Sequence, residues 1–358
     1  MKQLAGVRPG RILVRGVNWV GDAVMSLPAL AALIKACPDA CIDVLARPWV
    51  AEIYAMHPGV SQVLIINERQ QHKGLKGILN LGRQLKSGAY EWAVLLQNAF
   101  KAAFLAWAGD IPVRLGYDRD ARRLLLTHPV PCPPALRRVH ETAYYLNILH
   151  QAGLAPAPDP AGHMPHLYLS DEAKVKADDF LSGQKGRRLL GLAPGAAFGP
   201  AKCWPAENFA ACALRLARKY DMAVLIFGSA GEAGSAETVQ KGLAGIPVYN
   251  LCGRTNLALA LALLARLDLL LTNDSGLMHG AAALGTPTLA VFGSTNPLTT
   301  RPLGPRVKVL RKDFACSPCL KPVCPRNMDC FRAITPQEAA EAGQILLEKG
   351  CDQDSISR

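Results

Sequence analysis

Short apolar runs alternate with helical patterns along most of this 358-residue chain, and they do so in two separate series. The first series has runs at residues 11–17, 41–46, 60–66 and 92–96, and a helical pattern begins near Asp22, after the first of them. The second series has runs at residues 189–193, 224–227, 267–272 and 288–292. Such alternation is typical of parallel sheets covered by helices. We therefore predict an α/β chain with two doubly wound parallel sheets that face each other across a cleft.

The length of the chain supports the same division, because an ordinary domain has about 150 residues. We place the domains at residues 1–175 and 176–358, with a polar, partly helical linker between about residues 165 and 187. The pattern at residues 335–349 predicts a capped terminal helix that can return to the first domain. Half of the residues are hydrophobic and 19% are charged, so both domains can bury large cores.

The sequence predicts neither a secretory signal nor a membrane span. The basic N-terminal residues are not followed by the apolar segment and small-residue cleavage site of a signal peptide. The apolar run at residues 257–271 contains Arg266 and Asp268 and is too short to cross a bilayer of about 30 Å. We therefore expect a cytoplasmic protein.

A formal net charge of +12 predicts an anionic partner, and charge alone leaves nucleic acid, a phosphorylated sugar and an acidic membrane surface as alternatives. The sequence has no helix-turn-helix punctuation, no RNA-binding aromatic motif and no zinc-finger spacing that ends in paired histidines. Nucleic acid is therefore not an expected partner.

The turn at residues 16–22 is spaced like a phosphate-binding loop, but it has Asp22 where such a loop has lysine. Because that carboxylate would repel phosphate, ATP hydrolysis is not indicated. Asp22 is instead well placed to take a proton from an attacking hydroxyl group, and Gly21 permits close approach of a ligand. A purely structural role for Asp22, as a helix cap or as a complement to the helix dipole, is the alternative.

A second polar turn, at residues 273–280, leads from a buried run into a helix of small residues. Free backbone N–H groups and the helix dipole at such a start favour a phosphate, which Ser275 and Gly276 allow to approach. His279 lies on the first turn of that helix. The alternative is an ordinary helix start with Asp274 or Ser275 as its cap and a packed histidine.

Two further side chains follow strands of the second series and strengthen the phosphate interpretation. Lys202 follows the first of these strands, from where a flexible cation can reach a phosphate in the same crevice. Glu232 follows the next strand and could accept hydrogen bonds from ribose hydroxyls. A solvated lysine and an exposed glutamate without a role are the alternatives.

Residues 69–86 carry five cations and no acidic residue, namely Arg69, Lys73, Lys76, Arg83 and Lys86. At helical spacing these lie near one face, and a second face has Leu75, Ile78, Leu81 and Leu85. The basic face could bind acceptor phosphates or an anionic membrane surface, where each cation contributes roughly 1 kcal/mol. A solvated helix face is the alternative. Arg119 and Arg122 form a second, weaker candidate for the same role.

Four of the eleven cysteines lie within fifteen residues, at Cys316, Cys319, Cys324 and Cys330. One CxxC pair with two further thiols could bind a structural zinc ion, although the second pair departs from the usual CxxC spacing. Disulfides in another compartment are the alternative. The remaining cysteines are scattered and indicate reduced thiols in cores.

Residues 19–28 (WVGDAVMSLP), 202–205 (KCWP) and 273–279 (NDSGLMH) together resemble glycosyltransferase family 9, the bacterial lipopolysaccharide heptosyltransferases. The resemblance extends from Arg11 to about Leu347 and keeps the order of the motifs. It implies the GT-B fold, with two Rossmann-like domains that bind the acceptor on the first and the nucleotide sugar on the second. It also implies that Asp22 is the general base and that the cysteine cluster is structural.

The resemblance implies ADP-heptose as the donor substrate, held by Lys202, Glu232, Thr255, Asp274, Ser275, Gly276 and His279. Lys202 is also expected to act in catalysis by meeting the charge of the leaving group, so that no cofactor and no catalytic metal are required. The expected acceptor is of the heptosyl-Kdo2-lipid A type. Its expected contacts are Asn18, Trp19, Gly21, Arg69, Lys73 and Lys76.

The implied reaction moves L-glycero-D-manno-heptose from ADP-heptose to the first heptose of the inner core, with inversion. Direct displacement suits one base and no covalent enzyme intermediate. Peripheral contact with the cytoplasmic face of the inner membrane is expected with such an acceptor. A related family member with another acceptor and a noncatalytic sugar-nucleotide-binding protein are the alternatives.

Overall fold

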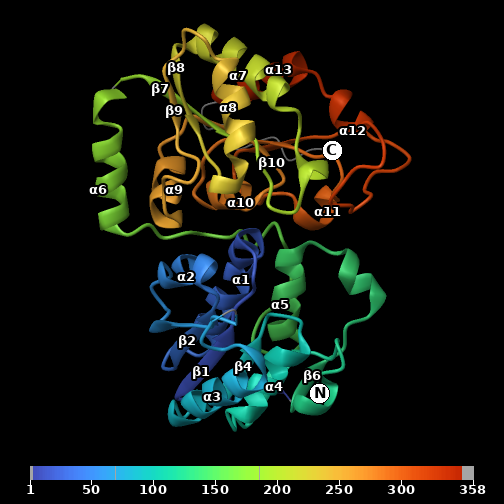
Figure 1. The fold of residues 1–358 in the computed structure, drawn as a ribbon. Helices are drawn as coiled ribbons and strands as arrows, with labels where there is room; N and C mark the ends of the chain where they lie inside the picture. The colour runs from blue at the N-terminus through green and yellow to red at the C-terminus, as the bar shows by residue number, and fades with distance from the viewer. Residues whose placement is uncertain (1–2, 69, 185, 349–358) are drawn as a thin grey trace. The chain divides into compact units, whose positions relative to one another are not determined.

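The computed structural model describes residues 3–68, 70–184 and 186–348, which form two compact units divided between Tyr168 and Leu169 (Figure 1). The division lies earlier than the boundary expected at residues 175 and 176. Helix α6 (Asp171–Phe180) contacts α9 (Leu257–Leu264), so the polar stretch expected as part of the linker packs with the second unit.

The first unit has a six-stranded parallel sheet in the order β3-β2-β1-β4-β5-β6. Its strands are β1 (Arg11–Arg15), β2 (Cys41–Ala46), β3 (Gln62–Ile65), β4 (Trp92–Leu95), β5 (Val113–Tyr117) and β6 (His128–Val130). Its helices are α1 (Val20–Ala36), α2 (Pro48–Ala55), α3 (Gly74–Ser87), α4 (Phe100–Ala108) and α5 (Glu141–Gln151), with 3-10 turns η1 (Arg123–Leu125) and η2 (Pro134–Arg138). The central strands β1, β2 and β4 are almost fully buried, as continuous apolar runs in a parallel sheet should be.

The second unit has a six-stranded parallel sheet in the order β12-β11-β10-β7-β8-β9. Its strands are β7 (Arg188–Ala193), β8 (Met222–Ile226), β9 (Val248–Asn250), β10 (Leu269–Asn273), β11 (Thr288–Val291) and β12 (Val307–Leu310). Besides α6 and α9, its helices are α7 (Ala206–Tyr220), α8 (Ala233–Lys241), α10 (Gly276–Ala283), α11 (Pro297–Thr300), α12 (Asp329–Arg332) and α13 (Pro336–Glu348). Its 3-10 turns are η3 (Ser182–Gln184), η4 (Pro200–Lys202) and η5 (Ala230–Glu232).

Because the strands of each sheet are parallel, the loops that follow them leave from one edge, called here the carboxyl edge. Every predicted strand is confirmed within a few residues, whereas β5, β6, β9 and β12 were not predicted. Strands β9 and β12 are only partly buried and lie at the margins of their sheet. Strand β6 has only three residues, one of which is Pro129. Short edge strands lack the continuous apolar run on which the prediction depended.

The terminal helix α13 packs within the second unit, against α7 and against the strands β10, β11 and β12. Its buried residues Ala339, Ala340 and Ala342 belong to the same core as Phe209 and Leu216 of α7. In the described part of the chain, no helix is both long and apolar enough to cross a membrane.

Candidate functional site

Asp22 lies at the carboxyl edge of the first sheet, in the first turn of α1. Trp19 holds the N-cap position of this helix and its side chain makes no capping hydrogen bond, so the interpretation of Asp22 as the cap is wrong. A negative charge in the first turn interacts favourably with the helix dipole. Asp22 is half-buried, so solvent and a ligand can reach it.

Two buried side chains, Arg15 and Tyr54, hold the loop between β1 and α1. The Tyr54 hydroxyl accepts a hydrogen bond from Val17 N at 3.1 Å and lies 3.1 Å from Ser26 Oγ of α1. Arg15 donates to the side-chain oxygen of Asn18 at 3.2 Å, and burial lowers the pKa of Arg15 to about 10. These contacts fix the loop that precedes Asp22 before any ligand binds.

The other expected acceptor residues near this loop are placed as follows. The Trp49 indole donates to Asn18 O at 2.8 Å, so both the side chain and the backbone carbonyl of Asn18 accept hydrogen bonds. Gly21 lies within the first turn of α1, and the Trp19 side chain is 59% exposed.

A second carboxyl group, that of Glu141 at the start of α5, lies close enough to Asp22 to interact with its charge. Burial and, to a smaller extent, the charge of Asp22 raise the pKa of Glu141 to about 7, against the opposing effect of Arg119. The same two carboxylates, after burial itself, raise the pKa of Tyr145 on α5. Helices α1 and α5 pack against each other, which brings residues more than 100 positions apart together. The sequence analysis missed Glu141, because no local motif marks it.

Loops at the carboxyl ends of β4 and β5 are joined by Arg122, which is fully buried. Its guanidinium donates to Tyr117 O at 2.7 Å and to the side-chain oxygen of Asn98 at 2.8 Å. Asn98 in turn donates to the Tyr144 hydroxyl at 2.8 Å, and Arg119 donates to the same hydroxyl at 3.3 Å. Arg122 therefore holds the loops at this edge together and is not available to an acceptor. Arg119, the other arginine expected to bind the acceptor, is half-exposed.

The basic stretch forms α3, which begins at Gly74 and not at the first cation of the stretch. Lys73 is the N-cap residue, and Lys73 and Lys76 are both exposed. Arg69 lies outside the described residues. Leu75 was expected on the apolar face but is 66% exposed, because the helix turns it away from the core residues Ile78, Leu81 and Leu85.

Four expected donor-binding positions lie at the carboxyl edge of the second sheet. Lys202 follows β7, Glu232 follows β8, Thr255 follows β9 and Asp274 follows β10. These strands are neighbours in the order β10-β7-β8-β9. The structure thus brings to one edge side chains that lie up to 72 positions apart in the chain.

Lys202 and Asp274 form an ion pair, with Lys202 Nζ 2.8 Å from Asp274 Oδ2. Asp274 is 5% exposed, so a buried carboxylate holds the lysine ammonium near the edge of the sheet. The Phe198 ring also contacts the ammonium, which lies 5.4 Å from the ring centre. The solvated-lysine alternative is therefore wrong for Lys202.

Helix α10 begins directly after Asp274. Ser275 is its N-cap and accepts a hydrogen bond from Met278 N at 3.4 Å, so of the two capping alternatives the structure has Ser275. Gly276 is the first residue of the helix. His279 is buried on the first turn and is 5% exposed. Gly276 has no side chain that would block an anion beside Lys202. The positive end of the helix dipole at this position favours such an anion.

Glu232 closes a capping box with Ser229, whose backbone N–H and hydroxyl donate to Glu232 Oε2 at 2.6 and 2.8 Å. A Cβ atom on Gly195 would lie 2.1 Å from Glu232 Oε1, so the carboxylate also lies against the loop after β7. Glu232 is therefore held in place, and the alternative of an exposed glutamate without a role is wrong. Thr255 is half-buried in the turn before α9.

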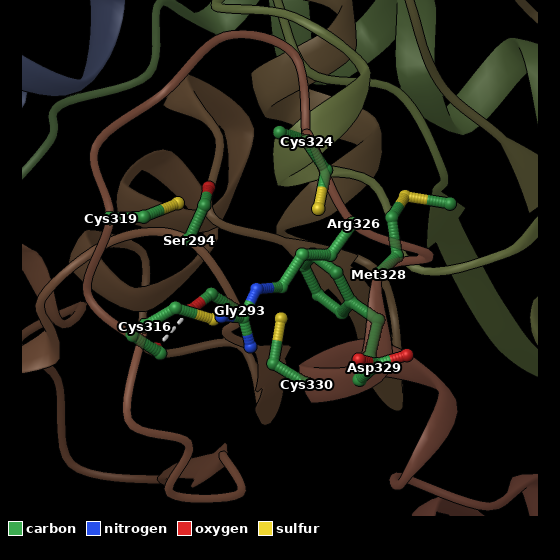
Figure 2. A pocket seen from close by; sticks show the side chains of 12 residues that line it. Gly293, Ser294, Cys316, Cys319, Cys324, Arg326, Met328, Asp329 and Cys330 are labelled. Carbon is green, nitrogen blue, oxygen red and sulfur yellow. Dashed lines mark hydrogen bonds between the residues drawn. The ribbon is translucent and has the colours of Figure 1, made fainter.

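The four clustered cysteines lie in the segment between β12 and α12 and at the start of α12. Each is a free thiol, and all four line one pocket together with Ser294 (Figure 2). Burial raises the pKa of Cys330, and the three neighbouring cysteines act in the same direction. Among the described residues, no three His, Cys, Asp or Glu side chains converge as a complete metal-ligand set would.

The sequence model of glycosyltransferase family 9 (heptosyltransferase) matches residues 78–328, which include the Lys202, Glu232 and Asp274 positions. The chain belongs to this family. It is therefore a glycosyltransferase of the heptosyltransferase family, and the two parallel α/β units are those of the GT-B fold that the motifs predicted.

Similar proteins support the same assignment. Lipooligosaccharide heptosyltransferase 2 of Haemophilus ducreyi is 33% identical over 84% of this chain and 88% of its own length. Lipopolysaccharide heptosyltransferase 1 of Pseudomonas aeruginosa is 30% identical over 94% of this chain and 98% of its own. The structure of Escherichia coli ADP-heptose lipopolysaccharide heptosyltransferase II superposes with a TM-score of 0.78 at 29% identity, and it covers 94% of this chain and 98% of that one.

Proposed function

We propose that this family 9 glycosyltransferase is a heptosyltransferase II, which moves L-glycero-D-manno-heptose from ADP-heptose to the first heptose of the lipopolysaccharide inner core. The observation that carries the proposal is that an ion-paired lysine, the N-terminus of α10 and the Glu232 carboxylate follow neighbouring strands at one carboxyl edge of the second unit. Two relatives at 33% identity are named lipooligosaccharide and lipopolysaccharide heptosyltransferase 2, and the similar structure from Escherichia coli is that of an ADP-heptose lipopolysaccharide heptosyltransferase II, which supports a heptosyl transfer of this type.

The second unit is proposed to hold ADP-heptose. In this proposal the Lys202 ammonium and the N-terminus of α10, with Ser275 and Gly276, bind the diphosphate. The ion pair with Asp274 supports it, because a pre-placed cation loses little freedom when the anion arrives. His279 on the first turn of α10 is proposed to lie beside the same phosphates.

The nucleoside part of the donor is proposed to lie toward β8 and β9. The Oε1 atom of Glu232 is the freer of its two carboxylate oxygens, because Oε2 already accepts two hydrogen bonds from Ser229. That oxygen can accept from a ribose hydroxyl group. Thr255, in the turn after β9, is proposed to contact the adenosine.

The first unit is proposed to bind the acceptor and to supply the base. Asp22 takes the proton of the acceptor hydroxyl as that oxygen bonds to the anomeric carbon of the donor heptose. The bond from this carbon to the diphosphate oxygen breaks, and ADP leaves with the electron pair and with inversion at the sugar. Lys202 meets the charge that develops on the leaving phosphate. Proton transfer by a positioned group typically contributes roughly 10²–10⁴-fold to the rate.

The acceptor is proposed to be a heptosyl-Kdo2-lipid A, bound at the cytoplasmic face of the inner membrane. Asn18, Trp19 and Gly21 would contact its sugars, and Lys73 and Lys76 of the exposed α3 start, with Arg69, would meet its phosphates or the membrane surface. The acceptor domain itself is proposed to be the first unit and the donor domain the second.

A related member with another acceptor is the second candidate, and the 30% identity to a heptosyltransferase 1 over nearly the whole chain favours it. A noncatalytic sugar-nucleotide-binding protein is a third. An assay with ADP-heptose and a series of truncated core acceptors separates the three. Type II predicts product only with an acceptor that already carries one heptose. Transfer to Kdo2-lipid A without heptose would indicate type I, and binding without transfer to any acceptor would indicate a binding protein.

A further inference from the structure

We propose that one face of the first unit, built from α4 and the neighbouring parts of α3 and η1, docks onto an anionic lipid bilayer. The proposed transfer reaction assigns no role to α4 or η1. An acceptor carried by a membrane would give such a surface its use, and in this the inference rests on the proposed function. The docking step itself needs neither donor nor acceptor, so it can be tested alone.

Helix α4 carries a row of aromatic side chains on its outer face. Phe100, Phe104 and Trp107 follow one another at helical spacing, and the ring centres of successive members lie 6.2 and 5.5 Å from each other. Phe100 is 49% exposed and Trp107 is 51% exposed, whereas the small residues Ala103 and Ala106 belong to the core of the unit. A surface helix ordinarily turns its large apolar residues inward. This helix does the reverse, which marks an interaction surface.

Helix α3 and turn η1 extend the aromatic row. Helix α3 lies beside α4 (Figure 1), and a Cβ atom on Gly82 would lie 2.9 Å from the Cβ atom of Ala108. Leu75 and Leu79 precede Gly82 at helical spacing, so they lie on the side of α3 that faces α4. Leu75 is largely exposed, and Leu124 of η1, which also contacts α4, is 95% exposed. We call these three leucines and the aromatic row the apolar strip.

Cations outnumber acidic residues around the apolar strip. The exposed cations of the same elements are Lys73, Lys76, Arg83, Lys86, Lys101 and Arg123. Helix α3 has no acidic residue. Glu68, Asp110 and Asp118 pair with three of the six cations, so a surplus of three positive charges remains. The anionic surface of a cytoplasmic leaflet attracts such a surplus, and each cation close to it strengthens binding roughly fivefold.

An anionic bilayer fits both the apolar strip and the cations. Aromatic and leucine side chains insert between lipid headgroups while cations stay among the headgroups. A soluble phosphate would leave the apolar strip in water. A second copy that docked by the same face would bring two surpluses of positive charge together, which opposes association.

The position of the surface suits an acceptor that is held in a membrane. The aromatic row begins at Phe100, after β4, and therefore at the carboxyl edge of the first sheet. Strand β4 is the direct neighbour of β1, which Asp22 follows. A bilayer on this face would thus adjoin the edge that is proposed to bind the acceptor.

Vesicle sedimentation tests the surface without substrates. The full chain should bind vesicles of phosphatidylethanolamine and phosphatidylglycerol at low ionic strength, and it should bind vesicles of phosphatidylcholine weakly. Trp107→Gln and Leu124→Gln should each weaken binding to the anionic vesicles at least about fivefold, because a large apolar side chain no longer leaves water. Arg83→Gln should weaken it roughly fivefold by loss of one cation. Val175→Gln, at an exposed apolar residue of α6 in the second unit, is the matched control and should bind as the wild type does.

Tryptophan fluorescence tests which face meets the bilayer. Lipid with brominated acyl chains should quench the emission of the wild type when the protein binds. Trp107→Phe keeps an aromatic ring and should still bind, but most of the quenching should be lost. Quenching of the same extent in Trp107→Phe would overturn the proposal.

The vesicle test has further outcomes that contradict the surface. The wild type might be expected to fail only if the surface has no role, so no binding to anionic vesicles would overturn the proposal. Equal binding by Leu124→Gln and Val175→Gln would do the same, because Leu124 is too exposed for its replacement to unfold the chain. Self-association without lipid that Trp107→Gln abolishes would show that a second copy is the occupant, and would also overturn the proposal.

Transfer to a lipid-free core acceptor separates this inference from the proposed function. Trp107→Gln should transfer to that acceptor as the wild type does. Vesicle binding without such transfer would support the surface and reject the transfer reaction. Transfer without vesicle binding would support the reaction and reject the surface.

Discussion

The carboxyl edges of the two sheets carry different chemistry. The edge of the first unit presents a carboxylate in a helix turn, a second carboxyl group whose pKa is raised to about 7, and loops held by buried arginines. The edge of the second presents an ion-paired lysine and the N-terminus of α10. The first edge is suited to accept a proton and the second to bind an anion. One topology, used twice, thus presents two sets of side chains whose chemistry depends on the residues that follow each strand.

Replacement of Asp22 tests the first edge and should have the largest effect. Asp22→Asn keeps the shape of the side chain but removes its basicity, so the rate of transfer should fall roughly 10²–10⁴-fold. Binding of ADP should not change, because Asp22 belongs to the other edge. Rates under single turnover and calorimetry with ADP measure the two effects.

Asp39→Asn is a matched control for Asp22→Asn, because Asp39 is an exposed residue after the same helix. It should leave the transfer rate unchanged. An unchanged transfer rate in Asp22→Asn would show that Asp22 is not the base. Weaker ADP binding by Asp22→Asn would show that the two edges are not separate in function.

Replacement of Lys202 tests the second edge. Lys202→Met keeps the length of the apolar stem and removes the cation, so a charge-assisted contact worth about 1.5–3 kcal/mol is lost. The Kd for ADP should rise roughly 10- to 100-fold. Lys241→Met, at an exposed cation at the end of α8, should have no effect. Equal affinities of the Lys202 and Lys241 variants would contradict the assignment of the diphosphate to this edge.

The raised pKa of Glu141 predicts a pH dependence that is specific to the first edge. Its pKa is raised from 4.5 to about 7 by burial and by Asp22, so the folded protein binds this proton more tightly than the unfolded chain does. Folding stability is therefore lost as the pH rises from about 4.5 through 7, by up to about 3 kcal/mol. Glu141→Gln should remove this loss.

Urea unfolding at pH 5 and pH 8 measures the Glu141 effect as a difference between the wild type and the variant. Glu141→Gln should gain stability relative to the wild type at pH 8 and little at pH 5. In an Asp22→Asn background the difference should shrink, because one cause of the raised pKa is gone. Parallel stability changes at both pH values would show that the pKa of Glu141 is not raised, and an undiminished difference in the Asp22→Asn background would show that Asp22 is not one of its causes.

The smallest expected effect concerns the loop beneath Asp22. A Cβ atom on Gly16 would lie 2.7 Å from the Tyr54 ring, so Gly16→Ala should push Tyr54 away from Val17 and destabilise the fold by about 1–3 kcal/mol. Gly234→Ala is the control, because a Cβ atom there meets nothing within 4 Å. Thermal unfolding measures both. Equal midpoints would show that the loop tolerates displacement of the Tyr54 side chain.

The two edges also differ in how far the sequence reveals them. The second edge was predicted from local patterns, because Asp274, Ser275 and Gly276 follow a buried strand directly and open a helix. The first edge is assembled from positions far apart in the chain, and only Asp22 belongs to a local motif. Glu141 and the Asn98–Tyr144 contact depend on which helix packs against α1, which spacing along the chain does not reveal.

Prediction of the fold met a similar limit. Buried central strands leave continuous apolar runs that identify them, whereas the short margins β6, β9 and β12 gain their structure from pairing with a neighbour. The local sequence of a strand does not reveal which neighbour it will pair with, so local propensity does not predict such strands. The terminal helix was recognised by its pattern, but its packing against α7 depends on complementary apolar faces.

Mass spectrometry of a defined acceptor tests the central claim most directly. Heptosyl-Kdo2-lipid A incubated with ADP-heptose and the full chain should gain the mass of one heptose residue, with ADP released in equal amount. No gain in mass by that acceptor, with a protein that binds ADP-heptose and is folded, would contradict the proposed transfer reaction.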